Sequence, residues 1–85
     1  KLLQTEENKG EVMVIEFSPS GEYIAAGDGN GHVMISRVVD ATCVCSFVGT
    51  SSVYDLKWDK TNFNLAVCFD DSTVAIIHLG MFLKQ

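Results

Sequence analysis

The feature that most constrains this chain is an internal repeat. Residues 12–38 align without a gap on residues 53–79 when the sequence is shifted by 41 positions, which places Phe17 on Trp58. Only four of the 27 aligned pairs are identical, but apolar residues recur at the same phase and turn-forming residues recur between them. A sequence that repeats in this way is expected to fold as two copies of one supersecondary unit.

Each copy reads as a series of short β-strands separated by turns. The apolar runs are rich in β-branched and aromatic residues and are bounded by clusters of Gly, Pro, Asn, Asp and Ser. The strands expected in the first copy are 12–17, 23–27, 32–37 and 42–48, and those in the second are 53–58, 65–69, 73–78 and 81–84. A repeat of about 40 to 45 residues that is built from four strands is typical of a β-propeller blade.

The turn after the first strand supports the repeat independently of the identities. In the first copy Pro19 fixes φ at the turn, and Gly21 is free to adopt a positive φ just after it. Asn62 occupies the Gly21 position in the second copy, and Asn tolerates the left-handed conformation better than most residues. Two different sequences therefore satisfy one backbone requirement.

Several motifs resemble those of the WD40-repeat β-propellers, and the resemblance covers nearly the whole chain. Residues 17–21 (FSPSG) resemble the family's first hairpin, Phe-Ser-Pro-Asp-Gly, and residues 23–27 (YIAAG) resemble its Leu-Ala-Ser-Gly strand. Residues 71–74 (DSTV) resemble the Asp-Gly-Thr-Val that opens the third strand. The Trp-Asp pair that names the family is replaced by residues 36–37 (SR) and 77–78 (IH).

The resemblance implies an all-β fold made of two four-stranded antiparallel blades of a WD40-like β-propeller, which is a partial propeller. Residues 1–11 would be the end of a preceding blade and a loop, residues 12–52 the first repeat and residues 53–85 the second. Two blades do not close a ring, because propellers typically contain four to eight. The chain would then be a fragment of a longer propeller, self-associate into a ring, or complete the ring of a partner, and we favour the fragment.

The resemblance also implies which buried polar network is missing. In the family a His, a Ser or Thr, an Asp and a Trp form a hydrogen-bonded tetrad within each blade. The second copy has Thr50, Val67 and Ile77 at three of these positions and keeps Asp71 alone, and the first copy has Ala26, Asn30 and Ser36. We therefore expect both blades to be held by apolar packing, since replacing a whole polar network by apolar groups can be nearly neutral.

Composition excludes several classes of function. The net charge of −5 and the scattering of the six basic residues argue against a nucleic-acid partner. The 47% hydrophobic content excludes disorder, and the longest uncharged run, residues 41–54, is too short to span a membrane. Residues 1–10 do not have the pattern of a secretory signal, so we expect Cys43, Cys45 and Cys68 to be free thiols in the cytoplasm or the nucleus.

No motif predicts a catalytic residue, a metal site or a cofactor. Residues 27–31 (GDGNG) read as a β-turn, because no helix follows to bind a phosphate. Asp28, Asn30 and His32 have the spacing of the first calcium ligands, but the calcium-loop glycine is Val33 here. The cysteines lack a second cluster for zinc, and no serine lies in a nucleophile-elbow motif.

The aromatic residues fall into two groups. Phe17 and Trp58 end the first strand of each copy, so we expect both to fill the core between blades. Phe69 falls on Asp28 in the repeat, at the edge of a turn. There it is either an exposed contact anchor or a residue that packs on the neighbouring blade.

By resemblance to the family, the turns after the second strands and the loop between blades share the rim that usually binds partners. The candidate partner-binding rim consists of Asp28, Asn30, Thr50, Ser51, Ser52, Phe69, Asp70 and Asp71. Its acidic character favours a basic peptide or protein. We therefore predict a non-catalytic protein-interaction scaffold, completed by further propeller blades in cis or in trans.

Two alternatives from other classes stay open. One is the docking module of a multidomain enzyme, with the catalytic domain elsewhere in the polypeptide. The other is a free-standing eight-stranded β-sandwich that binds a small ligand.

Overall fold

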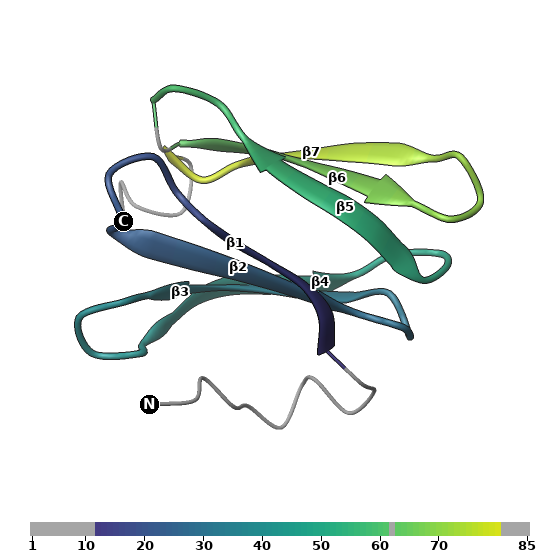
Figure 1. The fold of residues 1–85 in the computed structure, drawn as a ribbon, viewed down its shortest axis with the longest axis horizontal. Coiled ribbons are helices and arrows are strands. Elements are labelled where there is room, and N and C mark those ends of the chain that lie inside the picture. Colours follow the sequence, from purple (N-terminus) through teal and green to yellow (C-terminus); the bar gives the residue numbers. More distant parts are fainter. Residues whose placement is uncertain (1–11, 62, 81–85) are drawn as a thin grey trace.

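The computed structural model describes residues 12–61 and 63–80. Within these residues the strands are β1 (Val12–Phe17), β2 (Tyr23–Asp28), β3 (His32–Arg37), β4 (Cys43–Val48), β5 (Val53–Trp58), β6 (Asn64–Phe69) and β7 (Val74–His78). They form two antiparallel sheets, sheet 1 in the order β1-β2-β3-β4 and sheet 2 in the order β5-β6-β7. The two sheets lie face to face as two layers (Figure 1).

The predicted all-β architecture with two antiparallel sheets is confirmed. The bounds of β1, β3 and β5 are those expected from the sequence, and β2, β4, β6 and β7 differ from expectation by one residue at one end. The fourth strand expected for the second copy, at 81–84, lies outside the described residues, as does Asn62 in the turn that matches Gly21. Gly21 itself has the expected positive φ, 80°.

The backbone repeats with the same offset as the sequence. Val12 pairs with Asp28 in sheet 1, and Val53 pairs with Phe69 in sheet 2. Both residues of the second pair therefore lie 41 positions after the corresponding residues of the first. Every other pair between β1 and β2 has its counterpart between β5 and β6, including a register shift after the first pair. The pairs between β2 and β3 likewise match those between β6 and β7. The two sheets are therefore copies of one unit at the level of hydrogen-bonding register.

The turn after the second strand of each sheet also repeats. Gly31 N–H donates to the Asp28 carbonyl, and Ser72 N–H donates to the Phe69 carbonyl. Gly31 has φ 85° and Ser72 has φ 71°, so both occupy the left-handed region. The second copy forms this turn with a serine in place of glycine, the residue that adopts a positive φ at the lowest steric cost.

The core lies between the two sheets and is apolar. It is made of the buried residues Tyr23, Ala25, Val33, Ile35, Val53, Leu56, Trp58, Leu65, Val67, Phe69, Ile77 and Leu79. Trp58 stacks on Tyr23 with ring centroids 6.3 Å apart, and its indole Nε1–H donates to the Glu16 carbonyl at 3.1 Å. The side chain of Trp58 therefore fills the core between the sheets, as expected from its place in the repeat.

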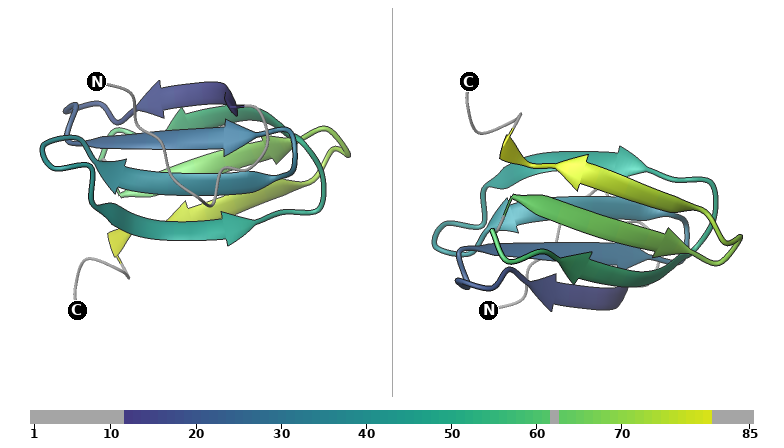
Figure 2. Two further views of the ribbon diagram at one scale, coloured as in Figure 1. Left: turned by 90° about the horizontal axis from the view of Figure 1, so that it is seen from below. Right: turned by 90° about the horizontal axis from the view of Figure 1, so that it is seen from above.

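The same expectation for Phe17 is wrong, because its side chain is exposed in this structure. The shared register gives Phe17 the orientation in sheet 1 that Trp58 has in sheet 2. Trp58 points at sheet 1, so Phe17 points away from sheet 2. Among the described residues, no further sheet lies on that side of sheet 1 (Figure 2).

Candidate functional site

The predicted rim is built around the loop that connects the two sheets, residues 49–52. On one side of this loop, Gly49 N–H donates to the Gly31 carbonyl at 2.9 Å. On the other side, the Ser52 carbonyl accepts a hydrogen bond from Asp70 N–H, also at 2.9 Å. The connecting loop is therefore held between the β2–β3 turn of sheet 1 and the β6–β7 turn of sheet 2. Asn30, another predicted rim residue, is exposed in the first of these turns.

Side chains also hold the connecting loop to the β6–β7 turn. The Thr50 hydroxyl donates to Oδ2 of Asp71 at 2.6 Å, and Asp71 N–H donates to the Ser51 hydroxyl oxygen at 3.2 Å. The other carboxylate oxygen of Asp71 accepts hydrogen bonds from the backbone N–H and the hydroxyl of Thr73. Thr73 was not among the predicted rim residues, although its position two residues after an aspartate is a common signal for such a turn. The structure thus joins Thr50, Ser51 and Asp71 directly.

These hydrogen bonds change the acidity of Asp71. The Thr50 hydroxyl, followed by the Thr73 hydroxyl and N–H, lowers the pKa of Asp71 from 3.8 to about 2. Each bond favours the ionised carboxylate, which accepts hydrogen bonds better than the neutral acid does. Asp71 therefore carries a full negative charge at physiological pH, although its oxygens are already engaged within the chain.

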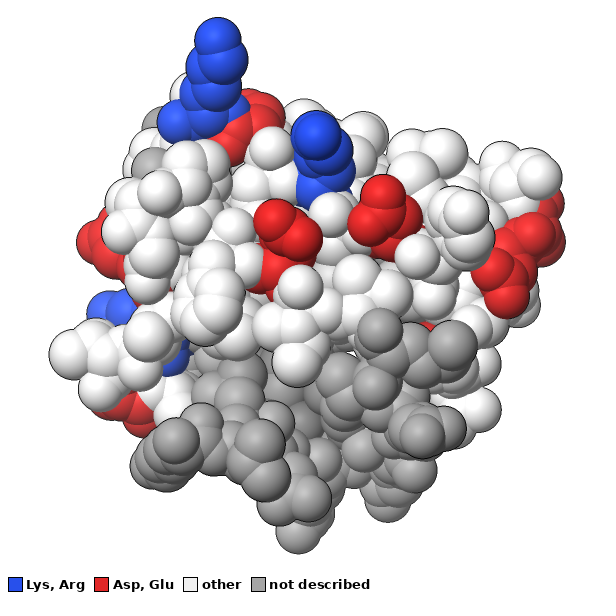
Figure 3. All heavy atoms as spheres, viewed as in Figure 1, with Lys and Arg blue, Asp and Glu red and all other residues white. Residues whose placement is uncertain are grey.

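Asp70 differs from its neighbour. Its side chain is exposed, and within the described part of the chain no hydrogen bond or ion pair engages its carboxylate. In the space-filling view, acidic side chains gather at the right-hand edge, near the end of the molecule where Figure 1 shows the β6–β7 turn (Figure 3). Asp70 is thus the rim carboxylate that is open to a partner.

Asp28 is a correction to the predicted rim, because its side chain is fully buried. One carboxylate oxygen accepts the N–H groups of Asn30 and His32, both at 2.9 Å, and the other lies 3.2 Å from Nδ1 of His32. These contacts fix the β2–β3 turn, so Asp28 has a structural role here. The residue two positions later is Asn30, a spacing that is the sequence signal for this Asp-centred turn.

For Phe69 the structure selects the packing alternative, and the exposed anchor is wrong. The Phe69 ring is buried and lies edge-on to Phe47, with centroids 6.3 Å apart. It also packs against Gly49, where an added Cβ would overlap the ring. Strict alternation with Leu65 and Val67, which face the same core, is the signal that predicts this burial.

The expectation about the missing tetrad is right for the apolar residues and wrong for Asp71. Val67 and Ile77 are buried in the core, as apolar replacements should be. Asp71 is not alone, because Thr50 bonds to it from the position where the family has His. In the first copy Ala26 and Ser36 are buried, and the Ser36 hydroxyl has no hydrogen-bond partner among the described residues.

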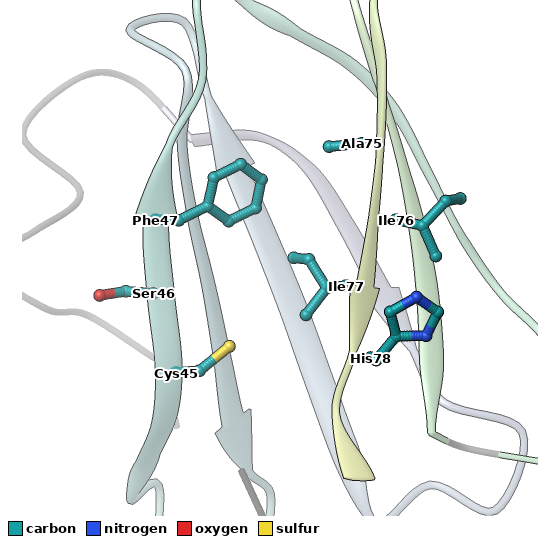
Figure 4. A pocket seen from close by; sticks show the side chains of 7 residues that line it. All are labelled: Cys45, Ser46, Phe47, Ala75, Ile76, Ile77 and His78. Atoms are coloured by element: carbon teal, nitrogen blue, oxygen red, sulfur yellow. The ribbon is translucent and has the colours of Figure 1, made fainter. Parts of the chain in front are cut away.

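An apolar groove of about 400 Å³ lies between β4 and β7, which are the last strands of the two sheets among the described residues. Cys45 and Phe47 point from β4 towards β7, and Ala75 and Ile77 point back from β7, whereas the other lining residues point away (Figure 4). Burial, with a smaller effect of Cys43, raises the pKa of the Cys45 thiol to about 11. The thiol is therefore protonated at neutral pH and is a poor nucleophile.

The described residues contain no group of three His, Cys, Asp or Glu side chains that could hold a metal ion. Cys43, Cys45 and Cys68 form no disulfide with one another. In the same part of the chain, none of the helical structure is long and apolar enough to cross a membrane.

Comparison with known proteins gives consistent matches. A family model described as the anaphase-promoting complex subunit 4 WD40 domain matches residues 1–61. WD40 repeat-containing protein HOS15 of Arabidopsis thaliana is 30% identical over 70 residues, which are 82% of this chain and 11% of that protein. The chain thus spans about a tenth of the length of this curated relative.

Two solved structures share the arrangement of strands. Kluyveromyces lactis Hsv2 with a complete loop 6CD superposes with a TM-score of 0.78 at 16% identity, over 88% of this chain and 24% of that chain. The Cps50 (Swd1) β-propeller domain of Myceliophteria thermophila superposes with a TM-score of 0.67 at 20% identity, over 80% of this chain and 22% of that chain. At these identities the matches establish the fold, which is that of neighbouring blades in a β-propeller.

Proposed function

Because the chain belongs to the WD40-repeat family, we propose that it is a non-catalytic scaffold for protein–protein interaction within a WD40 β-propeller. Propellers of this family typically hold protein partners, and the two sheets described here match part of such a propeller. Further blades, in cis or in trans, complete the propeller. The propeller fold of the structural neighbours favours this function over a free-standing ligand-binding sandwich.

The partner-binding surface in this proposal is the acidic rim at the connecting loop. The observation that carries it is the pair of adjacent carboxylates on the β6–β7 turn. Asp71 is held ionised by Thr50 and Thr73, and Asp70 is exposed without a described partner. Two adjacent negative charges on a fixed turn attract a Lys- or Arg-containing segment and orient it.

In this proposal the two carboxylates have different roles. Asp71 is engaged by four hydrogen bonds that involve the connecting loop and Thr73, so it maintains the shape of the rim. Asp70 contributes its side chain to none of these bonds and contacts the partner directly. Replacing Asp70 therefore tests binding without disturbing the turn.

The test is the binding of a panel of fluorescent lysine- and arginine-rich peptides, measured by anisotropy with the whole chain. Asp70→Lys should weaken binding by about three- to tenfold and reduce its dependence on salt, because a repulsive charge replaces an attractive one at a solvated site. Glu22→Lys is the matched control. It makes the same charge change on an exposed residue in the turn between β1 and β2, which lies at the end of β2 away from the rim. This variant should leave binding nearly unchanged.

Equal losses in the two variants would mean that only the net charge matters, and the acidic rim would no longer be supported as the binding surface. Unchanged affinity in Asp70→Lys would contradict the role of Asp70 directly.

A further inference from the structure

A β-bulge at the start of β5 turns two consecutive side chains to the outer face of sheet 2. The register with β6 shifts between Val53 and Asp55, so Tyr54 is the extra residue on β5. Val53 and Leu56 on either side are buried, whereas Tyr54 and Asp55 are both exposed. Because neighbouring residues of a regular strand point to opposite faces, the bulge adds Tyr54 to the outer face without displacing Asp55.

Tyr54 is an exposed aromatic residue whose ring is available for contact. Its side chain is 71% exposed, more than that of Phe17 or Phe63. Neither of the aromatic pairs in the described residues includes Tyr54. A tyrosine side chain offers a large, rigid contact area at a low cost in conformational entropy, so this position suits a partner contact.

Tyr54 lies at the rim, beside the carboxylate that is open to a partner. Val53, the residue before Tyr54, pairs with Phe69, the residue before Asp70. The Ser52 carbonyl accepts the Asp70 N–H at 2.9 Å, so the start of β5 and the β6–β7 turn are held together at this corner. Figure 1 shows both at the same end of the molecule. Tyr54 and Asp70 are therefore within reach of a single long side chain of a partner.

The charges around Tyr54 are negative. Asp55 follows it on the outer face, and Asp70 and Asp71 lie across from it on the β6–β7 turn. Lys57, the basic residue within β5, lies further from the rim. A cation that approaches the ring is therefore attracted by the ring and by more than one carboxylate.

We propose that Tyr54 makes this rim selective for arginine over lysine in a protein partner. The planar guanidinium of arginine stacks on an aromatic face and still has N–H groups at its edge to donate to a carboxylate. Tyr54 supplies the aromatic face, and Asp70 supplies the carboxylate. The ammonium group of lysine is a strongly hydrated point charge, so it gains less from the ring. The role of Tyr54 rests on the proposed function, since it names the side chain that the acidic rim recognises.

The test compares two fluorescent peptides of equal length and charge, one with arginine and the other with lysine at every basic position. Their binding to the whole chain is measured by anisotropy. Wild type should bind the arginine peptide about two- to fivefold more tightly, the range expected for a cation–aromatic contact at an exposed site. Tyr54→Ala should abolish this preference by weakening the binding of the arginine peptide, whereas Tyr54→Phe keeps the ring and should retain it.

Phe63→Ala is the matched control. Phe63 is an exposed aromatic residue in the turn between β5 and β6, at the end of β5 away from the rim, so its removal should leave the preference unchanged. Circular dichroism checks that each variant keeps its β-sheet signal. If Tyr54→Ala loses that signal, Tyr54→Leu replaces it, because leucine keeps apolar area at this position without an aromatic ring.

Equal affinity of wild type for the two peptides would overturn the inference, as would a preference for arginine that persists in Tyr54→Ala. An equal loss of the preference in Phe63→Ala would also contradict the role of Tyr54. These results are separate from the test of the proposed function, because Asp70→Lys should weaken the binding of both peptides whether or not Tyr54 distinguishes them. Unchanged affinities in Asp70→Lys would contradict the proposed function and, with it, the role of Tyr54.

Discussion

At the scale of single residues, the sequence predicted where the turns fall better than it predicted which way their side chains point. Asp28 and Phe69 occupy the same place in the two copies, and both are buried although they were expected on the rim. A turn is indicated by composition, but the direction of the last strand residue depends on the alternation of the strand and on what packs against it. Thr50 and Asp71 were both predicted at the rim, whereas their hydrogen bond joins residues 21 positions apart and required the fold.

The hydrogen bonds to Asp71 give a pH dependence. The folded pKa of about 2 is below the ordinary 3.8, so the stability due to Asp71 is fully present above about pH 4 and is lost as the pH falls through 2. Thr50→Val removes the hydrogen bond that lowers the pKa of Asp71 most and should raise that pKa towards 3.8. An NMR titration of the side-chain carboxyl measures the shift directly.

Thr61→Val is the control for that titration. The Asn64 amide and then the Thr61 hydroxyl lower the pKa of Asp59, which lies on a different turn. Thr61→Val should therefore raise the pKa of Asp59 part of the way and leave that of Asp71 unchanged. An Asp71 pKa that stays near 2 in Thr50→Val would show that Thr50 does not hold the carboxylate.

Two buried serines should respond oppositely to the same substitution. The Ser36 hydroxyl is buried without a described partner, so Ser36→Ala should raise the free energy of unfolding by up to about 1 kcal/mol. The Ser18 hydroxyl accepts Tyr23 N–H at 3.1 Å, so Ser18→Ala should lower it by about 1 kcal/mol. Urea denaturation of the two variants gives both values. A loss of stability in Ser36→Ala as large as that in Ser18→Ala would show that its hydroxyl is satisfied in solution.

At the scale of elements, the offset of 41 predicted the strands because each run of apolar residues is confirmed by a second run in the other copy. β1, β3 and β5 have their expected bounds for this reason. The repeat does not predict how closely the sheets approach, since that distance depends on side chains that differ between the copies. Gly27 of sheet 1 faces Val53 of sheet 2, while its counterpart in sheet 2 is Cys68.

Gly27→Ala should destabilise the contact between the sheets. A Cβ at this position would lie 2.6 to 2.9 Å from three carbon atoms of the Val53 side chain, which is too short for a stiff β-branched neighbour to accommodate without a shift. The expected loss is about 1–3 kcal/mol in the free energy of unfolding, measured by urea denaturation. Gly80→Ala is the matched control, because an added Cβ there meets no atom of the described residues within 4 Å. Equal stability of the two variants would contradict the close approach of the sheets.

At the scale of the whole molecule, the sequence predicted two repeated units and the comparisons place them in the WD40-repeat family. The sequence did not predict which copy of each repeated position is covered, because Val33 and Val74 are the same residue at the same place in the repeat. Only the stacking of sheet 2 on one side of sheet 1 distinguishes them. The exposed outer faces follow from that stacking, as does the exposure of Phe17 where Trp58 is buried.

The most direct test of this packing uses Trp58, the chain's only tryptophan, whose fluorescence therefore reports the contact between the sheets alone. With Tyr23 stacked on it and Glu16 accepting its N–H, the indole should be weakly quenched by acrylamide. Tyr23→Ala should increase the quenching while far-ultraviolet circular dichroism stays β-rich. Quenching in the wild type as strong as that of free tryptophan, with the β signal intact, would show that the sheets form without packing face to face and would contradict the two-blade arrangement.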